Sequence, residues 1–233
     1  MPLPRDVGVV LVAAGRGERA GVGAPKQYRA IAGVPMLLRA LRPFTSHPSV
    51  GQVVVVLPPA DAAVPPPWLA AMIGSALVVA AGGEARQASV AAGLAVLSPA
   101  CTIVVVHDAA RPFVAAAVID AVIAVARSGS AALAALPLGD TLKEEDPAAP
   151  GWAIRTLPRD RLWRAQTPQA FPRALLQRAH AEAVRAGAIA TDDAALVERL
   201  GERVRLVPDS VRNVKVTTPD DFIMAERLAG GTA

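Results

Sequence analysis

The sequence is poor in cysteine, aromatic residues and lysine, and each shortage excludes a class of protein. Its single cysteine, Cys101, rules out an internal disulfide framework or a cysteine-rich zinc site, and its apolar neighbours predict a buried structural thiol. Aromatic residues form 3% of the chain, too few to stack many single-stranded bases, and a net charge of +4 over 233 residues is weak for a nucleic-acid-binding face. The sequence has no apolar stretch long enough to span a membrane and no signal-peptide pattern at its start. We therefore expect a cytoplasmic protein that binds neither nucleic acid nor membranes.

Lysine is scarcer than the overall charge suggests. Of the 24 cationic residues only three are lysines, and the other 21 are arginines. Lys143 precedes the acidic run 144–146, so we expect a solvated surface charge there. Lys26 and Lys215 instead lie in two of the motifs described below, where a compact ammonium group suits contact with phosphate.

Apolar runs alternate with helical patterns along most of the chain. Strands are expected at residues 7–14, 52–57, 76–80, 102–107, 131–136 and 203–207. Helices are expected at residues 36–45, 68–73, 87–97, 115–127, 172–186, 192–200 and 219–228. Valine-rich strands separated by helices are typical of a sheet covered on both faces. The sequence therefore predicts one α/β domain over residues 1–233, a Rossmann-like, doubly wound, mostly parallel sheet with ligands at the carboxyl ends of its strands.

Residues 137–168 interrupt this alternation. The segment is polar and contains several prolines, with one candidate strand at residues 152–156. It is long for a connection inside a compact domain, which favours a functional excursion or a protruding β-arm used for dimerisation. A mobile surface insertion is the alternative.

The loop after the first expected strand, residues 13–27, combines small residues with cations. Small residues let a flat base or a phosphate approach the main chain, and glycines let backbone N–H groups surround phosphate oxygens. The candidate nucleotide-binding residues here are Ala13, Ala14, Gly15 and Gly17. Arg19 and Lys26 add two cations to the same loop, so it predicts a site for nucleotide phosphates.

Two other phosphate-binding motifs are alternatives for this loop. The spacing Gly15-x-Gly17-x-x-Ala20 matches the dinucleotide fingerprint of dehydrogenases, but that motif must open a helix at once. The glycines and proline within residues 21–25 interrupt any such helix. A Walker A loop is excluded, because no Gly-Lys-Ser/Thr closes the segment.

A second candidate loop follows the expected strand at residues 76–80. Gly82 and Gly83 come after that strand, and Ser89 is expected to begin the next helix. The N–H groups and hydroxyl of such a helix start can contact a nucleotide. An ordinary glycine turn is the alternative for Gly82 and Gly83.

A third candidate loop follows the expected strand at residues 102–107. Asp108 can orient substrate hydroxyls or assist a metal ion, and Arg111 can bind a phosphate through two N–H groups. The alternative is that Asp108 and Arg111 pair with each other across the turn. We interpret His107 as structural, because no Ser/His/Asp set is visible in the sequence.

Several separated motifs together carry a family resemblance. They are Pro25-Lys26-Gln27-Tyr28, GGEARQASV at 82–90, VHDAARP at 106–112, DTLK at 140–143, Trp163 with QTPQ at 166–169, TDDA at 191–194 and NVKVT at 213–217. In this order and spacing, from Val10 to Glu226, the chain resembles the 2-C-methyl-D-erythritol 4-phosphate cytidylyltransferase family of the non-mevalonate isoprenoid pathway. The flanks of Arg19, Glu18 and Ala20, depart from the usual pattern of that family.

The resemblance implies a reaction and a set of site residues. CMP passes from CTP to 2-C-methyl-D-erythritol 4-phosphate, which gives 4-diphosphocytidyl-2-C-methyl-D-erythritol and pyrophosphate. The expected catalytic cations are Arg19, Lys26, Arg159 and Lys215. The expected CTP contacts are Ala13, Ala14, Gly15, Gly17, Gly82, Gly83, Ser89 and Ala109. The expected substrate contacts are Asp108, Arg111, Thr141 and Thr167.

The implied reaction sets the chemistry that these residues must supply. The nucleophile is a phosphate monoester that is already ionised at neutral pH, so in-line attack on the α-phosphate needs no general base. Catalysis then depends on positioning two anions and stabilising the charge that develops between them. Mg²⁺ is expected as cofactor, held mainly by CTP phosphates rather than by a protein metal site. The resemblance also implies a homodimer in which the arm contributes to the site of a second subunit.

Alternatives remain open for the activity. A ribitol-5-phosphate cytidylyltransferase, or one for another alditol or sugar phosphate, would differ mainly in the arm that carries Thr141 and Arg159. A non-catalytic nucleotide-binding module is an alternative of another class, but the four cations together argue against it. The chain stops shortly after its last expected helix, so we expect no fused second enzyme domain.

Overall fold

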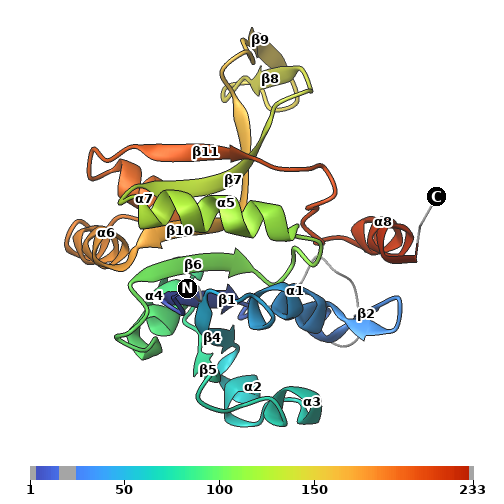
Figure 1. The fold of residues 1–233 in the computed structure, drawn as a ribbon. Helices are drawn as coiled ribbons and strands as arrows, with labels where there is room; N and C mark the ends of the chain where they lie inside the picture. Colours follow the sequence, from blue (N-terminus) through green and yellow to red (C-terminus); the bar gives the residue numbers. More distant parts are fainter. Residues whose placement is uncertain (1–3, 16–24, 231–233) are drawn as a thin grey trace.

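The centre of the fold is a seven-stranded sheet with the strand order β11-β7-β10-β6-β1-β4-β5 (Figure 1). The computed structural model describes residues 4–15 and 25–230. In chain order the strands of this sheet are β1 (Val7–Val12), β4 (Val50–Leu57), β5 (Leu77–Ala81), β6 (Ile103–Asp108), β7 (Ala131–Pro137), β10 (Trp163–Pro172) and β11 (Val204–Pro208). All pairings are parallel except those of β10, which runs antiparallel to β6 and β7. The predicted mostly parallel α/β sheet is confirmed.

Helices cover both faces of the sheet. One face packs against α1 (Met36–Thr45), α2 (Pro59–Ala63), α3 (Pro67–Ala70) and α5 (Ala116–Arg127). The other face packs against α4 (Arg86–Val96), α6 (Arg173–Arg185) and α7 (Asp193–Glu198). A smaller apolar cluster joins α8 (Pro219–Gly230) to a two-stranded ribbon made of β2 (Ala30–Ile31) and β3 (Val34–Pro35).

The first strand shows why these runs are apolar throughout. Val9 and Leu11 belong to the core under α1 and α5, whereas Val10 between them belongs to the core under α4 and α6. All three side chains are fully buried, as expected for a parallel strand with helices on both faces. Because β1 is parallel to β4 and β6, the loops that follow these strands meet at one edge of the sheet.

The segment that interrupts the alternation forms a projecting hairpin. Strands β8 (Leu142–Glu145) and β9 (Ala153–Leu157) pair antiparallel and extend away from the end of the main sheet (Figure 1). Trp152 is 74% exposed and Ile154 51% exposed on this hairpin. The predicted protruding β-arm is therefore present, but it is shorter than residues 137–168, because β7 runs through Pro137 and β10 begins at Trp163.

One strand of the sheet and one helix differ from the prediction made from the sequence. Strand β10 was not predicted, because most of it falls in the polar segment 137–168 or in the polar run 166–169, yet residues 166–171 lie buried where the strand runs between β6 and β7. The helix expected at residues 68–73 is present only in part, because α3 ends at Ala70. The short helix α2 before it was not predicted, and a proline-rich stretch in which helical hydrogen bonds cannot continue separates α2 from α3.

Candidate functional site

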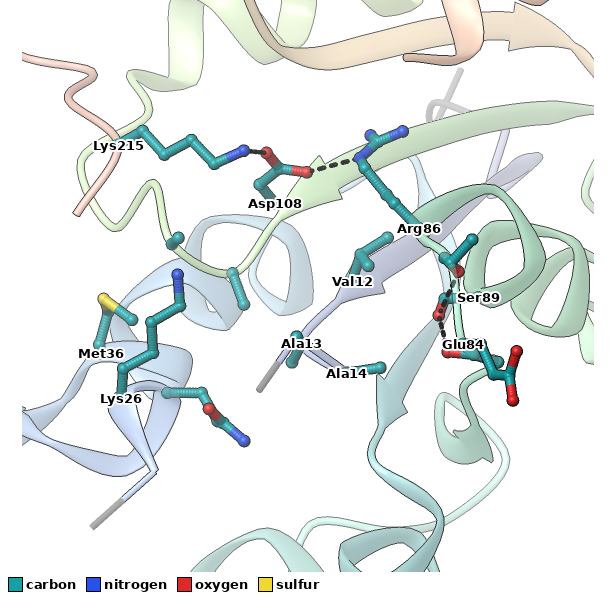
Figure 2. A pocket seen from close by; sticks show the side chains of 16 residues that line it. Val12, Ala13, Ala14, Lys26, Met36, Glu84, Arg86, Ser89, Asp108 and Lys215 are labelled. Atoms are coloured by element: carbon teal, nitrogen blue, oxygen red, sulfur yellow. Dashed lines mark hydrogen bonds and ion pairs between the residues drawn. The ribbon is translucent and has the colours of Figure 1, made fainter. Parts of the chain in front are cut away.

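A cavity of about 180 Å³ opens at the carboxyl edge of the sheet (Figure 2). Strand β1 supplies the loop at its floor, the start of α4 supplies one wall, and the end of β6 supplies another. The predicted nucleotide-binding residues that line it are Ala13, Ala14, Gly15, Gly83, Ser89 and Ala109. Of the expected catalytic cations, Lys26 and Lys215 line it as well. Gly17 and Arg19 lie outside the described residues.

Gly82 lies directly behind the floor of this cavity. A Cβ atom built on Gly82 would lie 2.4 Å from the Cβ of Ala14 and 2.9 Å from the Oγ of Ser89. Gly82 N–H donates to the carbonyl of Leu57 over 2.7 Å, so the residue is held at the end of the neighbouring strand. Glycine is therefore required for the close approach of the two loops, which favours a specific role over an ordinary turn.

Ser89 occupies a different position from the one predicted. Helix α4 begins at Arg86, so Ser89 lies one turn inside it, and its N–H donates to the carbonyl of Ala85 within the helix. Its hydroxyl lies 3.1 Å from the carbonyl of Ala85 and 3.4 Å from that of Gly83. The Ser89 N–H is therefore not available to a ligand, and the unpaired N–H groups of the first turn precede it.

Lys26 lies in a short 3-10 helix, η2 (Lys26–Tyr28), that borders the cavity. The hydroxyl of Tyr28 donates to the carboxylate of Asp61 in α2 over 2.8 Å. This bond ties the segment that carries Lys26 to the helical layer below the sheet. Figure 2 shows Lys26 and Lys215 across the cavity from Glu84 and Ser89.

Asp108, the last residue of β6, bridges two cations at the edge of the cavity (Figure 2). Its carboxylate pairs with Lys215 Nζ at 2.8 Å and with Arg86 Nε at 3.2 Å. Burial by itself would raise the pKa of Asp108, but the charges of Arg86 and Lys215 outweigh it and hold that pKa well below its usual range. Asp108 is therefore ionised at neutral pH and fixes the positions of both cations.

Arg86 is held from its other side by a buried carboxylate. Its Nη1 lies 2.7 Å from Asp193, and the second oxygen of Asp193 lies 2.9 Å from His180 Nε2. Asp193 is fully buried and His180 is 6% exposed. Burial lowers the pKa of Arg86, but the neighbouring charges of Asp108 and Asp193 more than reverse this and raise it overall. A chain of polar contacts thus runs from α6 through α7 and α4 to the end of β6.

A second cavity of about 190 Å³ adjoins the first. Both are lined by Arg86, Asp108 and Lys215, so these three side chains stand between them. The remaining lining residues of the second cavity are Arg111, Ala165, Gln166, Thr167, Gln169, Thr191 and Asp192. Of the predicted substrate contacts, Asp108, Arg111 and Thr167 therefore meet at this cavity.

Hydrogen bonds determine which nitrogen of His107 carries the hydrogen and whether the neighbouring Thr167 hydroxyl can donate or accept. His107 Nε2 lies 3.0 Å from the carbonyl of Arg111, which only accepts, so Nε2 carries the hydrogen and Nδ1 accepts from the Thr167 hydroxyl at 3.0 Å. Burial lowers the pKa of His107 to about 4, so the ring is neutral at pH 7. The only hydroxyl hydrogen of Thr167 is used by His107, and its oxygen already accepts from the N–H of Asp108 over 3.1 Å, so Thr167 can offer a ligand only its remaining acceptor lone pair.

Arg111 does not pair with Asp108, which was the alternative interpretation of these two residues. Its Nη1 donates instead to the carbonyl of Asn213 over 2.7 Å, and among the described residues the ion pairs of Asp108 are those with Arg86 and Lys215. The reason is geometric. The segment that carries Asn213 and Lys215 passes the end of β6, so Arg111 bonds to the carbonyl of Asn213 and Asp108 pairs with Lys215. Arg111 is 9% exposed, and its Nε has no hydrogen-bond partner within the part of the chain that the structure describes.

The two predicted residues of the arm are not brought to either cavity. Thr141 and Arg159 are exposed, and neither lines the cavities described above. The guanidinium of Arg159 donates to the carbonyl of Gly139 within the arm. In this chain by itself the arm and the carboxyl edge of the sheet are therefore separate features (Figure 1).

Arg86 and Asp193 are functional candidates that sequence reasoning did not assign. Both lie in motifs that carry the resemblance, which is the signal that was available. Their partnership joins residues 107 positions apart, and no local pattern predicts it.

Membrane and metal features are absent from the described part of the chain. None of the helices formed by residues 4–15 and 25–230 combines the length and apolarity needed to cross a bilayer. Within the same residues no three His, Cys, Asp or Glu side chains gather as a metal site. Cys101 is buried and free, as predicted, and burial raises the pKa of its thiol.

Comparisons with known proteins agree with this geometry. The family described as 2-C-methyl-D-erythritol 4-phosphate cytidylyltransferase matches residues 7–230. A protein of that name from Streptomyces avermitilis is 47% identical over 227 residues, which are 94% of this chain and 90% of that protein. A bifunctional enzyme IspD/IspF from Desulforudis audaxviator is 46% identical over 228 residues, and the match covers 97% of this chain but 57% of that protein. The crystal structure of the cytidylyltransferase from Thermus thermophilus superposes with a TM-score of 0.78 at 38% identity, covering 98% of this chain and 99% of that one.

Proposed function

This chain belongs to the 2-C-methyl-D-erythritol 4-phosphate cytidylyltransferase (IspD) family, and we propose that it transfers CMP from CTP to 2-C-methyl-D-erythritol 4-phosphate. The products are 4-diphosphocytidyl-2-C-methyl-D-erythritol and pyrophosphate. One observation carries the proposal: two adjoining cavities at the carboxyl edge of the sheet share Arg86, Asp108 and Lys215. A reaction between two anionic substrates needs two such compartments with cations where they meet.

The first cavity suits the nucleotide. Its floor of alanines and glycines admits a flat base close to the main chain, and the first turn of α4 offers free N–H groups. We assign CTP to Ala13, Ala14, Gly15, Gly82, Gly83, Ser89 and Ala109, and to Gly17 in the adjoining loop. Lys26 and Arg19 would bind the triphosphate from that same loop.

The second cavity suits the phosphorylated alditol. Arg111 offers a guanidinium, and Thr167 offers a hydroxyl oxygen that accepts. Lys215 lies at the border between the two cavities. From there its ammonium can hold the attacking phosphate near the nucleotide. The monoester oxygen then attacks the α-phosphate in line while pyrophosphate leaves, and no proton has to be removed first. His107 takes no part, because both of its ring nitrogens are engaged within the protein.

A magnesium ion is expected to accompany the triphosphate. The carboxylate nearest the cavity border, Asp108, is already shared by two cations, so the protein would contribute few ligands and the phosphate oxygens most of them. This donor set fits an ion that enters with CTP. Bound there, Mg²⁺ would neutralise charge on the phosphates.

The arm supports a homodimer. Its exposed apolar side chains, Trp152 and Ile154, would be covered by a second copy. Thr141 and Arg159 have no role at the cavities of their own chain, so we assign them to the acceptor site of the partner chain. A cytoplasmic location, where CTP is available, completes the proposal.

The direct test is release of pyrophosphate from CTP in the presence of Mg²⁺. We expect release with 2-C-methyl-D-erythritol 4-phosphate and little with ribitol 5-phosphate or with no acceptor. Lys26→Ala should lower the turnover number about a hundredfold, since one electrostatic contact to a transition state is worth about 3 kcal/mol. Arg178→Ala, at an exposed position on α6, is the control and should keep full activity. Turnover with ribitol 5-phosphate alone, or with no acceptor, would refute the assignment.

A further inference from the structure

Strand β10 carries two buried glutamines that differ in how their amides are satisfied. Gln169 is 1% exposed, its Nε2 donates to Asp192 over 2.8 Å, and its Oε1 accepts from the N–H of Ala194 over 3.0 Å. Gln166 is 3% exposed, and its Nε2 donates to the carbonyl of Asn213 over 3.0 Å. Its Oε1, however, is buried and has no hydrogen-bond partner among the residues that the structure describes.

The orientation of the Gln166 amide follows from its partner. The carbonyl of Asn213 can only accept, so the atom that faces it must be the NH₂ group of Gln166. Turning the amide over would place two oxygens against each other. The unsatisfied atom is therefore the amide oxygen, which needs a donor.

The position of Gln166 adds a second observation. It lines the second cavity beside Arg111 and Thr167. The pairing of β10 with β7 loses its register between Ala165 and Gln169, so Gln166 and Thr167 lie in an irregularity of the strand. Such irregularities redirect side chains and are common beside active sites.

We infer that Gln166 Oε1 accepts a hydrogen bond from a hydroxyl group of the acceptor substrate. The inference rests on the function proposed above. An ionised phosphate carries no hydrogen to donate, whereas an alditol carries several hydroxyl donors. A buried acceptor without a partner is costly, and a hydroxyl that satisfies it would be favoured over an analogue that lacks it. Gln166 is thus a residue that selects the polyol part of the acceptor rather than its phosphate.

The test replaces Gln166 by methionine, which has a similar length and no hydrogen-bonding amide. The carbonyl of Asn213 keeps its bond from Arg111 Nη1 at 2.7 Å, so the variant leaves no new unpaired group there. We expect the KM for 2-C-methyl-D-erythritol 4-phosphate to rise roughly threefold to tenfold, the value of one neutral hydrogen bond. The KM for CTP, the turnover number and the melting temperature should stay close to those of the wild type.

Gln169→Met is the matched control on the same strand. It removes an amide satisfied at both ends and leaves Oδ2 of Asp192 and the N–H of Ala194 without these partners, so its melting temperature should fall. An unchanged acceptor KM in Gln166→Met would mean that water satisfies Oε1, and would overturn the inference while leaving the proposed function intact. A melting temperature lowered as far as in Gln169→Met would also overturn it, because the role would then be structural. If the wild type itself failed to turn over, the proposed function would fail and the inference with it.

Discussion

Substitution of Gly82 by alanine tests the nucleotide cavity most directly. The added methyl group would lie 2.4 Å from the Cβ of Ala14 and 2.9 Å from the Oγ of Ser89. Both distances are well inside van der Waals contact, so one of the two loops must move. Gly82 is held by its 2.7 Å hydrogen bond to Leu57 at the end of β4, whereas Ala14 lies in the loop that follows β1. We expect Ala14 to be displaced into the cavity.

The size of the effect follows from the cost of overpacking. One extra methyl group in a tight site costs about 1–3 kcal/mol. The displaced Ala14 narrows a cavity of only about 180 Å³ where the nucleotide is proposed to bind. We therefore expect the Kd for CTP to rise between roughly fivefold and a hundredfold. Isothermal titration calorimetry of wild type and variant, both with Mg²⁺ present, measures this change.

Gly74→Ala provides the matched control. A Cβ at Gly74 meets no heavy atom within 4 Å, so the same chemical change should leave CTP binding unaltered. If Gly82→Ala bound CTP as tightly as the wild type, the nucleotide would not use this part of the cavity. The assignment of Gly82 and Ala14 would then be wrong.

Two further predictions concern buried charges around the site. Asp193→Asn removes the fully buried anion beside Arg86 and should lower the free energy of unfolding by about 3 kcal/mol. Glu202→Gln, which breaks an exposed pair, should cost under about 1 kcal/mol, and equal urea midpoints for the two variants would contradict the reasoning. His107 has a pKa of about 4 in the folded chain against about 6.5 when unfolded. The neutral ring therefore contributes fully to the free energy of unfolding above pH 6.5, and this contribution is lost as the pH falls through 4. Over that interval the free energy of unfolding of the wild type should therefore fall by up to about 3 kcal/mol more than that of His107→Gln. Denaturation followed by circular dichroism at several pH values measures this difference, and parallel pH profiles would refute it.

Local pattern was enough to predict most strands and several loops of the site. The run from Val7 to Val12 is apolar at every position because both of its faces are covered, and such a run is readable without coordinates. The small residues that follow β1 and the glycines that follow β5 were predicted at the correct edge of the sheet, because the buried strands before them could be recognised. Strand β10 was not recognised, because the polar residues at its centre are buried by the neighbouring strands β6 and β7, which its own residues do not indicate.

The candidate site was predicted only in part. Lys26, Lys215, Asp108 and Arg111 were singled out from motifs, and the structure brings them to two adjoining cavities. The partners of Asp108 were not foreseen, since Arg111 turns to the carbonyl of Asn213 and Arg86 takes its place. Ser89 was expected to begin its helix, but α4 begins at Arg86, so the N–H groups of the helix start belong to residues before Ser89.

By itself the sequence determined the α/β class, the edge of the sheet that holds the site and the motifs that mark the family. Periodicity and residue type are local properties, and the family follows from the order and spacing of short motifs along the chain. Only the tertiary structure decided that Arg86 is shared between Asp108 and Asp193, and that Gln166 has a satisfied nitrogen and an unsatisfied oxygen. Hydrogen-bond and ion-pair partners lie tens of residues apart along the chain, and they meet only when the order of the strands places them at one edge.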